Sequence, residues 1–244
     1  MAQYSFGSGL LFGRNLQNSP ATPVRFGALQ DVSIDISFSV KELFGQSQFP
    51  LAIGRGTGKI TGKANFAQFN AQAFNDLFFG LTNPATGSQV TVSSESKSVV
   101  SNAATATNNA TYLRDLGVTL NSDGSVLTRV TSGPTAAQYT VNESTGVYGF
   151  NLANATVVLL NYQYTDASNG KLITISNQLL GNAPTFLAVF TETFQAKKFT
   201  MVLNSCMSSK LALATKLEDF TIPSFDFQAF ADSSGNLGTM SQEE

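Results

Sequence analysis

The chain of 244 residues contains no histidine and no tryptophan, and it has a single cysteine, Cys206. Without histidine, a Ser-His-Asp triad, a Cys-His dyad and a histidine-ligated metal site are all impossible. One cysteine cannot form an internal disulfide, a CxxC pair or a thiolate zinc cluster. We therefore expect no catalytic residue, no metal and no cofactor, and we interpret Cys206 as a small buried apolar side chain.

Charged residues are also scarce. They make up 12% of the chain, about half the usual share of a soluble domain. The formal net charge is -2, and a dedicated nucleic-acid binder would need a basic surface that releases counterions. The last stretch is acidic, because no Lys or Arg follows Lys216. A surface with so little charge is expected to contact other protein.

Long apolar runs are missing as well. The N-terminus lacks a basic start followed by an apolar run of signal-peptide length, and no apolar stretch reaches the roughly 20 residues that span a bilayer. The sequence predicts no membrane segment. We expect a protein made in a cytoplasm that either stays there or leaves it without a secretion signal.

Residues 4–26 mix glycine, asparagine and proline with large apolar side chains, without a sustained helix or strand period. A disordered tail would carry fewer large apolar residues. We interpret residues 1–27 as an arm that docks either on its own core or on a neighbouring subunit, so that deleting residues 2–23 should leave a folded subunit. The candidate inter-subunit contacts are Phe6, Leu10, Leu11, Phe12 and Phe26.

A strict alternation follows between residues 31 and 40. Val and Ile, with one Phe, occupy the even positions, and Asp and Ser occupy the odd ones. This period of two predicts an antiparallel strand with one face in water. The polar face of that strand includes Asp31, Ser33, Asp35 and Ser37.

The stretch GRGTGKITGKANF, residues 54–66, looks like a phosphate-binding loop but fails the spacing tests. A Walker A loop needs glycine five residues before its Gly-Lys and then Ser or Thr, and neither Gly58-Lys59 nor Gly62-Lys63 meets either condition. The dinucleotide pattern GxGxxG is also absent. We interpret the stretch as a glycine turn followed by a strand.

The period changes after Phe66, where apolar residues fall on one helical face before Gly80 supplies a stop. This pattern predicts an amphipathic helix of about three turns that lies against the sheet. The side chains expected to pack are Phe69, Phe74, Leu77 and Phe78.

Residues 85–169 are rich in Ser, Thr, Asn and Ala, and short strand-like runs alternate there with turn residues. We predict a small inserted all-β domain, in which residues 93–111 form an exposed loop or linker of low complexity. The flanks, residues 28–84 and 170–244, together predict a mainly β fold, an antiparallel sandwich with one flanking helix.

These flanks resemble the tail tube proteins, or major tail proteins, of long-tailed bacteriophages. The resemblance is carried by FGALQDVSIDISFSVKELFGQSQFPLAIGRGTGKITGKANFAQFNAQAFNDLFFG near the start and by LNSCMSSKLALATKLEDFTIPSFDFQAFADSSGNLGTMSQEE at the end. It lies in the order of features: the alternating strand, Phe-Pro with a short strand, the Gly-Lys-rich strand, the helix ending in Phe-Phe-Gly, the Lys-Leu-Glu-Asp-Phe strand and the Ala-Phe-Ala-Asp tail.

The resemblance implies a β-sandwich or half-barrel subunit with a flanking helix, assembled as hexameric rings that stack into a hollow tube. DNA would pass through such a tube to the host cell without specific binding. The implied partners are further copies of the chain, tail completion or initiator proteins and a tape-measure protein. The protein would be a structural, non-enzymatic part of the virion tail, assembled in the host cytoplasm, with the insert on the tube exterior.

A conduit must not retain DNA, because one lysine–phosphate contact per chain is multiplied by six in a ring. We therefore expect acidic and hydroxyl side chains along the lumen, supplied by the first strand or by an acidic closing strand, with Lys59 and Lys63 turned away from the DNA. The lumen-facing candidates are Asp31, Ser33, Asp35, Ser37, Glu218 and Asp219.

Two alternatives belong to other classes. A surface- or carbohydrate-binding β-sandwich module of a virion would use the insert as its binding part, and the lack of tryptophan is unfavourable for it. An enzyme could use paired carboxylates such as Glu218 and Asp219, yet solvated strand faces explain such pairs better. Oxygen ligands in residues 121–125 could suggest Ca²⁺, but no bidentate Glu follows at the required spacing, and an ordinary Asp-Gly turn is preferred.

Overall fold

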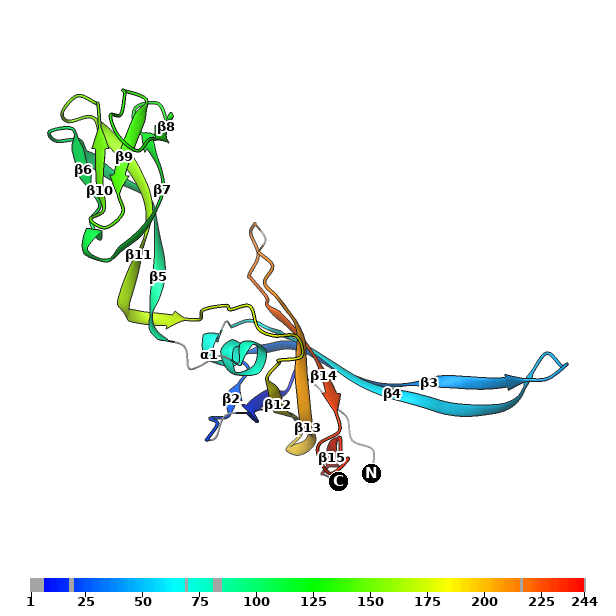
Figure 1. The fold of residues 1–244 in the computed structure, drawn as a ribbon. Coiled ribbons are helices and arrows are strands. Elements are labelled where there is room, and N and C mark those ends of the chain that lie inside the picture. The colour runs from blue at the N-terminus through cyan, green and yellow to red at the C-terminus, as the bar shows by residue number, and fades with distance from the viewer. Residues whose placement is uncertain (1–6, 18–19, 69, 81–84, 216, 244) are drawn as a thin grey trace. The chain divides into compact units, whose positions relative to one another are not determined.

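The computed structural model describes residues 7–17, 20–68, 70–80, 85–215 and 217–243. The protein is mainly β, with 59% strand and 5% helix, and it has two sheets, one of them a half-barrel. The chain divides into two compact units (Figure 1). Unit 1 is Met1–Pro84 with Ile173–Glu244, and unit 2 is Ala85–Leu172. Unit 2 begins at the residue expected for the insert and ends at Leu172 rather than at residue 169.

Unit 1 contains an eight-stranded sheet in the order β2-β1-β12-β13-β14-β4-β3, with β15 paired to β13. All of these pairings are antiparallel. The strands are β1 (Leu10–Asn15), β2 (Val24–Arg25), β3 (Leu29–Phe44), β4 (Pro50–Phe66), β12 (Thr185–Phe194), β13 (Lys197–Ala212), β14 (Ser224–Phe230) and β15 (Gly238–Gln242).

Aromatic side chains dominate the core of unit 1. Phe225 and Phe227 of β14 are buried at its centre, where their rings lie 5.9 Å from that of Phe186 on β12. Cys206 is buried as predicted, and this burial raises the pKa of its thiol to about 12. The cysteine is therefore a packing residue rather than a reactive thiol.

The described part of the expected N-terminal arm belongs to this sheet. β1 pairs with β12 over six residue pairs, and Leu11 and Phe26 are buried in the subunit's own core. The prediction that these two residues contact a neighbouring subunit is therefore wrong. Leu10 remains exposed, Phe12 is half-buried, and Phe6 lies outside the described residues.

The predicted helix is present but shorter and irregular. α1 (Ala71–Phe74) is followed by a π-helical turn, η1 (Asn75–Phe79), which ends at Gly80 with a left-handed φ of 61°. The Asn70 side chain caps the start by accepting a hydrogen bond from the Ala73 N–H at 3.2 Å. Phe74 and Leu77 are buried and Phe78 packs beside them, as predicted, while Phe69 lies outside the described residues.

A close backbone approach ties this helix to β1. A Cβ atom at Gly13 would lie 2.5 Å from Cδ1 of Leu77, so glycine leaves room for the helix to pack on the strand. The Asn15 amide donates a hydrogen bond to the Asp76 carbonyl at 2.6 Å. Among the described residues, no helix is long and apolar enough to cross a bilayer.

Unit 2 is a seven-stranded sheet in the order β5-β11-β7-β8-β9-β10-β6. Its elements are β5 (Ala85–Ser98), β6 (Ala103–Thr105), the short 3-10 helix η2 (Asn109–Thr111), β7 (Tyr112–Leu120), β8 (Val126–Arg129), β9 (Gln138–Asn142), β10 (Val147–Phe150) and β11 (Val157–Leu172). Residues 93–111 are not a linker, because they supply strand β6 and the buried Val99, Ala104 and Ala106.

A buried carboxylate joins the strands of unit 2. Asp115 on β7 accepts hydrogen bonds from the Tyr139 hydroxyl at 2.6 Å, the Tyr148 hydroxyl at 3.1 Å and the Gly117 N–H at 3.0 Å. Burial, reinforced by the neighbouring carboxylate, raises the pKa of both tyrosines. Because Tyr139 lies on β9 and Tyr148 on β10, this cluster links β7 to strands that it does not pair with.

Candidate functional site

β3 and β4, of 16 and 17 residues, form a hairpin that extends away from the other strands of unit 1 (Figure 1). β14 pairs with β4 only at Ile60–Ala229 through Asn65–Ser224. The part beyond this pairing, residues 36–59, is called the β3–β4 arm here. Its tip is the turn around residues 45–49.

The glycines of residues 54–62 lie inside β4, and the predicted glycine turn is wrong. Two of them, Gly58 and Gly62, lie directly against aromatic rings on the paired strands. A Cβ atom at Gly58 would lie 2.8 Å from the Phe38 ring, and one at Gly62 would lie 2.1 Å from the Phe227 ring. Glycine in these strands makes room for large neighbours rather than for a change of direction.

One face of the arm carries apolar side chains. In β3 the even-numbered residues Val32 and Ile34 pack against the core, and the same face continues outward along the arm. Its members there are exposed, and together they are called the apolar stripe: Ile36, Phe38, Val40 and Phe44 of β3, with Ile53 of β4 opposite Glu42. The Arg55 guanidinium lies 4.2 Å from the centre of the Phe38 ring. Glu42 and Arg55 share this face and interrupt the stripe. Exposed apolar side chains in such number are typical of surfaces that contact another protein.

The opposite face of the hairpin is polar and of mixed charge. Asp31, Ser33, Asp35 and Ser37 share one face, as their alternation predicts, and they pair with Asn65, Lys63, Thr61 and Lys59 respectively. Residues directly opposite one another on antiparallel strands point to the same side of the sheet. The expected separation of Asp31 and Asp35 from Lys59 and Lys63 is therefore wrong, because all four lie on one face.

This polar face continues across β14 and β13. Asp226 is paired with Lys63 on one side and with Lys210 on the other. Three Asp and three Lys residues of the paired strands thus share the face, and Lys41 continues it along the arm, so the face is of mixed charge rather than acidic. The six are Asp31, Asp35, Asp226, Lys59, Lys63 and Lys210.

Glu218 and Asp219 do not belong to a strand. They lie in a turn between β13 and β14, where Glu218 has a φ of 61°. The predicted closing strand is wrong for residues 217–220, the described part of Lys-Leu-Glu-Asp-Phe, and the strand that follows begins at Ser224. Phe220 in this turn is exposed, so the apolar residues of the segment do not alternate into the core.

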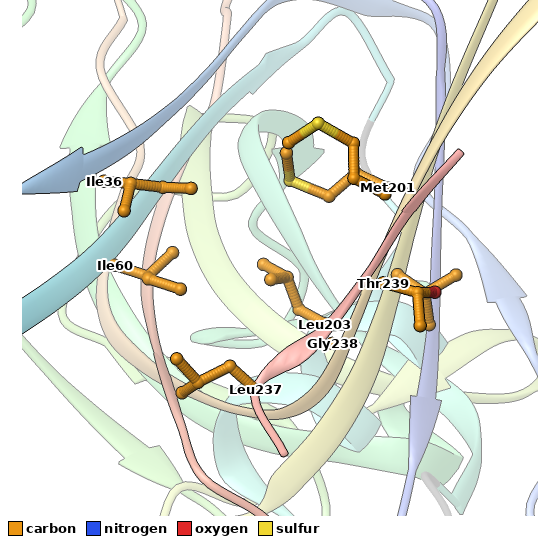
Figure 2. A pocket seen from close by; sticks show the side chains of 9 residues that line it. Ile36, Ile60, Met201, Leu203, Leu237, Gly238 and Thr239 are labelled. Atoms are coloured by element: carbon orange, nitrogen blue, oxygen red, sulfur yellow. The ribbon is translucent and has the colours of Figure 1, made fainter. Parts of the chain in front are cut away.

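An apolar groove of about 180 Å³ opens where the arm leaves the body of unit 1 (Figure 2). β14 pairs with β13 from Ser205 to Ala212, whereas β15 occupies the same edge of β13 from Phe199 to Leu203. The groove lies between β15 and the root of the arm. Its lining carries no charge and consists of Ile36, Ile60, Met201, Val202, Leu203, Leu237, Gly238, Thr239 and Met240.

A second hollow of about 300 Å³ is polar and is lined in part by Asp31 and Glu192. Two carboxylates alone do not make a metal site. In the part of the chain that the structure describes, no group of three or more His, Cys, Asp or Glu side chains is arranged to hold a metal ion.

These features define a mainly β, sandwich-like protein of two units with an exposed apolar arm and an apolar groove at its base. No known protein family and no curated protein matches the sequence. We therefore infer the function from the geometry of unit 1.

Proposed function

We propose that the protein is the structural subunit of a bacteriophage tail tube, built as hexameric rings that stack into a hollow tube through which DNA passes to the host cell. The observation that carries this proposal is the β3–β4 arm, which extends the apolar face of the core into solvent. The resemblance of the flanking segments supplies the ring number and the virion tail as the location.

The arm needs a partner to be stable. A two-stranded hairpin alone is marginal in water, and this one exposes several large apolar side chains, with Val40 at 58%. Full burial of one such side chain is worth about 1.5–3 kcal/mol, so covering the half-exposed stripe would stabilise an assembly by roughly 1 kcal/mol per residue. A neighbouring copy that covers the stripe supplies this energy in every subunit.

The sheet edges also favour assembly of identical copies. β3 is an edge strand of 16 residues, and the opposite edge is the two-residue strand β2 beside β1. A long free edge is a template for pairing with another chain. Pairing between opposite edges of successive copies is a heterologous contact, which closes into a ring when the rotation permits.

We propose that the polar face of mixed charge lines the channel. Lys59, Lys63 and Lys210 each have a polar or acidic residue directly across the strand, as in the pairing of Lys63 with Asp226. An acidic neighbour repels phosphate, which weakens the retention of DNA. Unit 2 would lie on the tube exterior, and tail initiator and tape-measure proteins would be the heterologous partners.

Negative-stain electron microscopy of the purified full chain tests the proposal. We expect rings or tubes about 100 Å across, since six domains of about 30 Å surround a pore. The double variant Phe38→Ser/Val40→Ser should keep the circular dichroism spectrum of the wild type and lose the tubes. Val126→Ser, at an exposed apolar position of unit 2, is the matched control and should assemble normally. Dispersed monomers of the wild-type chain at high concentration would contradict the proposal.

A further inference from the structure

We propose that the apolar groove beside β15 is the acceptor for the tip of the β3–β4 arm, residues 44–51, of a second copy of the chain. This inference rests on the proposed tube function, because a contact between the tip of one copy and the root of the next joins subunits along a stack.

The groove is built but left unfilled within one subunit. Ile60 and Leu203 belong to the core and form its floor, while Ile36 and Met240 at its rim are exposed. All five residues of β15 are exposed, so the strand is held mainly by its backbone pairing with β13 and closes the hollow poorly. The apolar lining faces water, and an apolar side chain that enters the groove removes this surface from water.

The tip has the composition that this groove accepts. No residue from Phe44 to Gly54 is charged, and the groove lining is uncharged as well. Phe49 and Leu51 are 80% and 70% exposed, so both offer nearly their whole apolar surface. Neither side of the contact has to desolvate a charge, which removes the largest cost of burying a surface.

The positions of tip and groove exclude closure within one copy. Ile36, at the groove, and Phe44, at the tip, are eight residues apart on an extended strand that pairs with β4, or about 26 Å at roughly 3.3 Å per residue. The tip therefore cannot fold back into its own groove without breaking the pairing of β3 and β4. A tip-to-root contact between copies leaves one free tip and one free groove at the ends, and it repeats without closing.

The surface area buried by one tip in one groove is too small for a stable dimer and favours an array of subunits. An aromatic side chain buries about 150–250 Å², so Phe44, Phe49 and Leu51 together offer roughly 300–400 Å². A stable pairwise interface needs about 800 Å² per partner. One tip in one groove is therefore too small to hold two subunits in dilute solution, whereas several contacts between neighbouring rings act together. The occupant is a second copy within an array.

Disulfide trapping tests the contact. The double variant Ser47→Cys/Thr239→Cys places one thiol at the tip and one at the groove, while the native Cys206 stays buried. After assembly and oxidation with copper phenanthroline, we expect a ladder of reducible multimers on a non-reducing gel. Ser47→Cys/Val126→Cys is the matched control, and it should give at least an order of magnitude less material above the dimer.

The outcomes separate this inference from the tube function. Tubes without a ladder would overturn the tip-to-groove contact and leave the tube intact. A ladder without tubes would support the contact and contradict the tube. The absence of both would contradict both.

A charged side chain introduced into the groove provides a second test of the tip-to-groove contact. Met240 is 61% exposed, so Met240→Glu should fold with an unchanged melting temperature while placing a carboxylate in the groove. We expect single rings in place of tubes. Val126→Glu is the control with the same change in charge. Tubes of normal length in Met240→Glu would overturn the proposal.

Discussion

Replacing Asp115 with alanine should destabilise unit 2 far more than a surface substitution does. The carboxylate accepts hydrogen bonds from Tyr139, Tyr148 and the Gly117 N–H. Tyr148 keeps a partner in the variant, because its hydroxyl also lies 2.9 Å from that of Tyr112. Two donors, the Tyr139 hydroxyl and the Gly117 N–H, lose their acceptor. Each buried donor left unsatisfied costs about 1–3 kcal/mol, so we expect a loss of roughly 2–6 kcal/mol.

The composition supplies the assay. The chain lacks tryptophan, and five of its six tyrosines, all except Tyr4, lie in unit 2. Tyrosine fluorescence during urea denaturation therefore reports the unfolding of unit 2 within the full-length protein. Asp123→Ala, which removes an exposed carboxylate from a turn of the same unit, is the control and should shift the transition little. A loss below about 1 kcal/mol for Asp115→Ala would refute the role assigned to the buried carboxylate.

Three further outcomes follow from the packing. Gly62→Ala should destabilise unit 1 by about 1–3 kcal/mol, measured by denaturation followed with circular dichroism, because the new Cβ would meet the Phe227 ring at 2.1 Å. Raising the pH should weaken unit 2, because burial raises the pKa of Tyr112 to about 12. The stabilisation that this protonated hydroxyl contributes is complete below the unfolded pKa of about 10 and is lost as the pH rises through about 12. Melting temperatures measured in alkaline buffers would show the loss. Deleting residues 2–23 should now unfold unit 1 instead of leaving it folded, because β1 and the buried Leu11 are removed, and a lost cooperative transition would report this.

The sequence predicted those features that depend on local periodicity. The alternation in residues 31–40 correctly assigned the two faces of β3, and the helical spacing of Phe74, Leu77 and Phe78 correctly assigned the packed face. Gly80 ends the helix through its left-handed conformation, which glycine adopts at little cost. In each case the residues that decide the structure are neighbours in the chain.

The features that failed depend on contacts between distant segments. β1 has only six residues, and its place in the sheet comes from pairing with β12, about 175 residues later in the chain. The glycines of β4 were predicted to form a turn. The aromatic rings that explain Gly58 and Gly62 lie on β3 and β14, and only the strand pairing brings them there. Residues 93–111 were predicted to be a linker because they are rich in small residues, as low-complexity segments are. The structure shows that alanines of this segment fill the core of unit 2.

The candidate site shows the same division most clearly. Period two places Asp31 and Asp35 on one face of β3, and Lys59 and Lys63 on one face of β4, but it cannot say which faces coincide. That depends on the register, which pairs Ser33 with Lys63 and Ser37 with Lys59. The apolar groove was beyond prediction because its lining joins four strands and the segment before β15.

The register of the polar face has a consequence for how a polyanion would move along it. Proteins gain much of their affinity for DNA by releasing the ions condensed on its phosphates. Lys63 is paired with Asp226 on one neighbouring strand and with Ser33 on the other, so an acidic residue lies across the strand from this lysine. A channel surface whose lysines have acidic neighbours would displace few of the ions condensed on a passing duplex. DNA in such a channel would keep its own ions and move with a friction that hardly depends on salt.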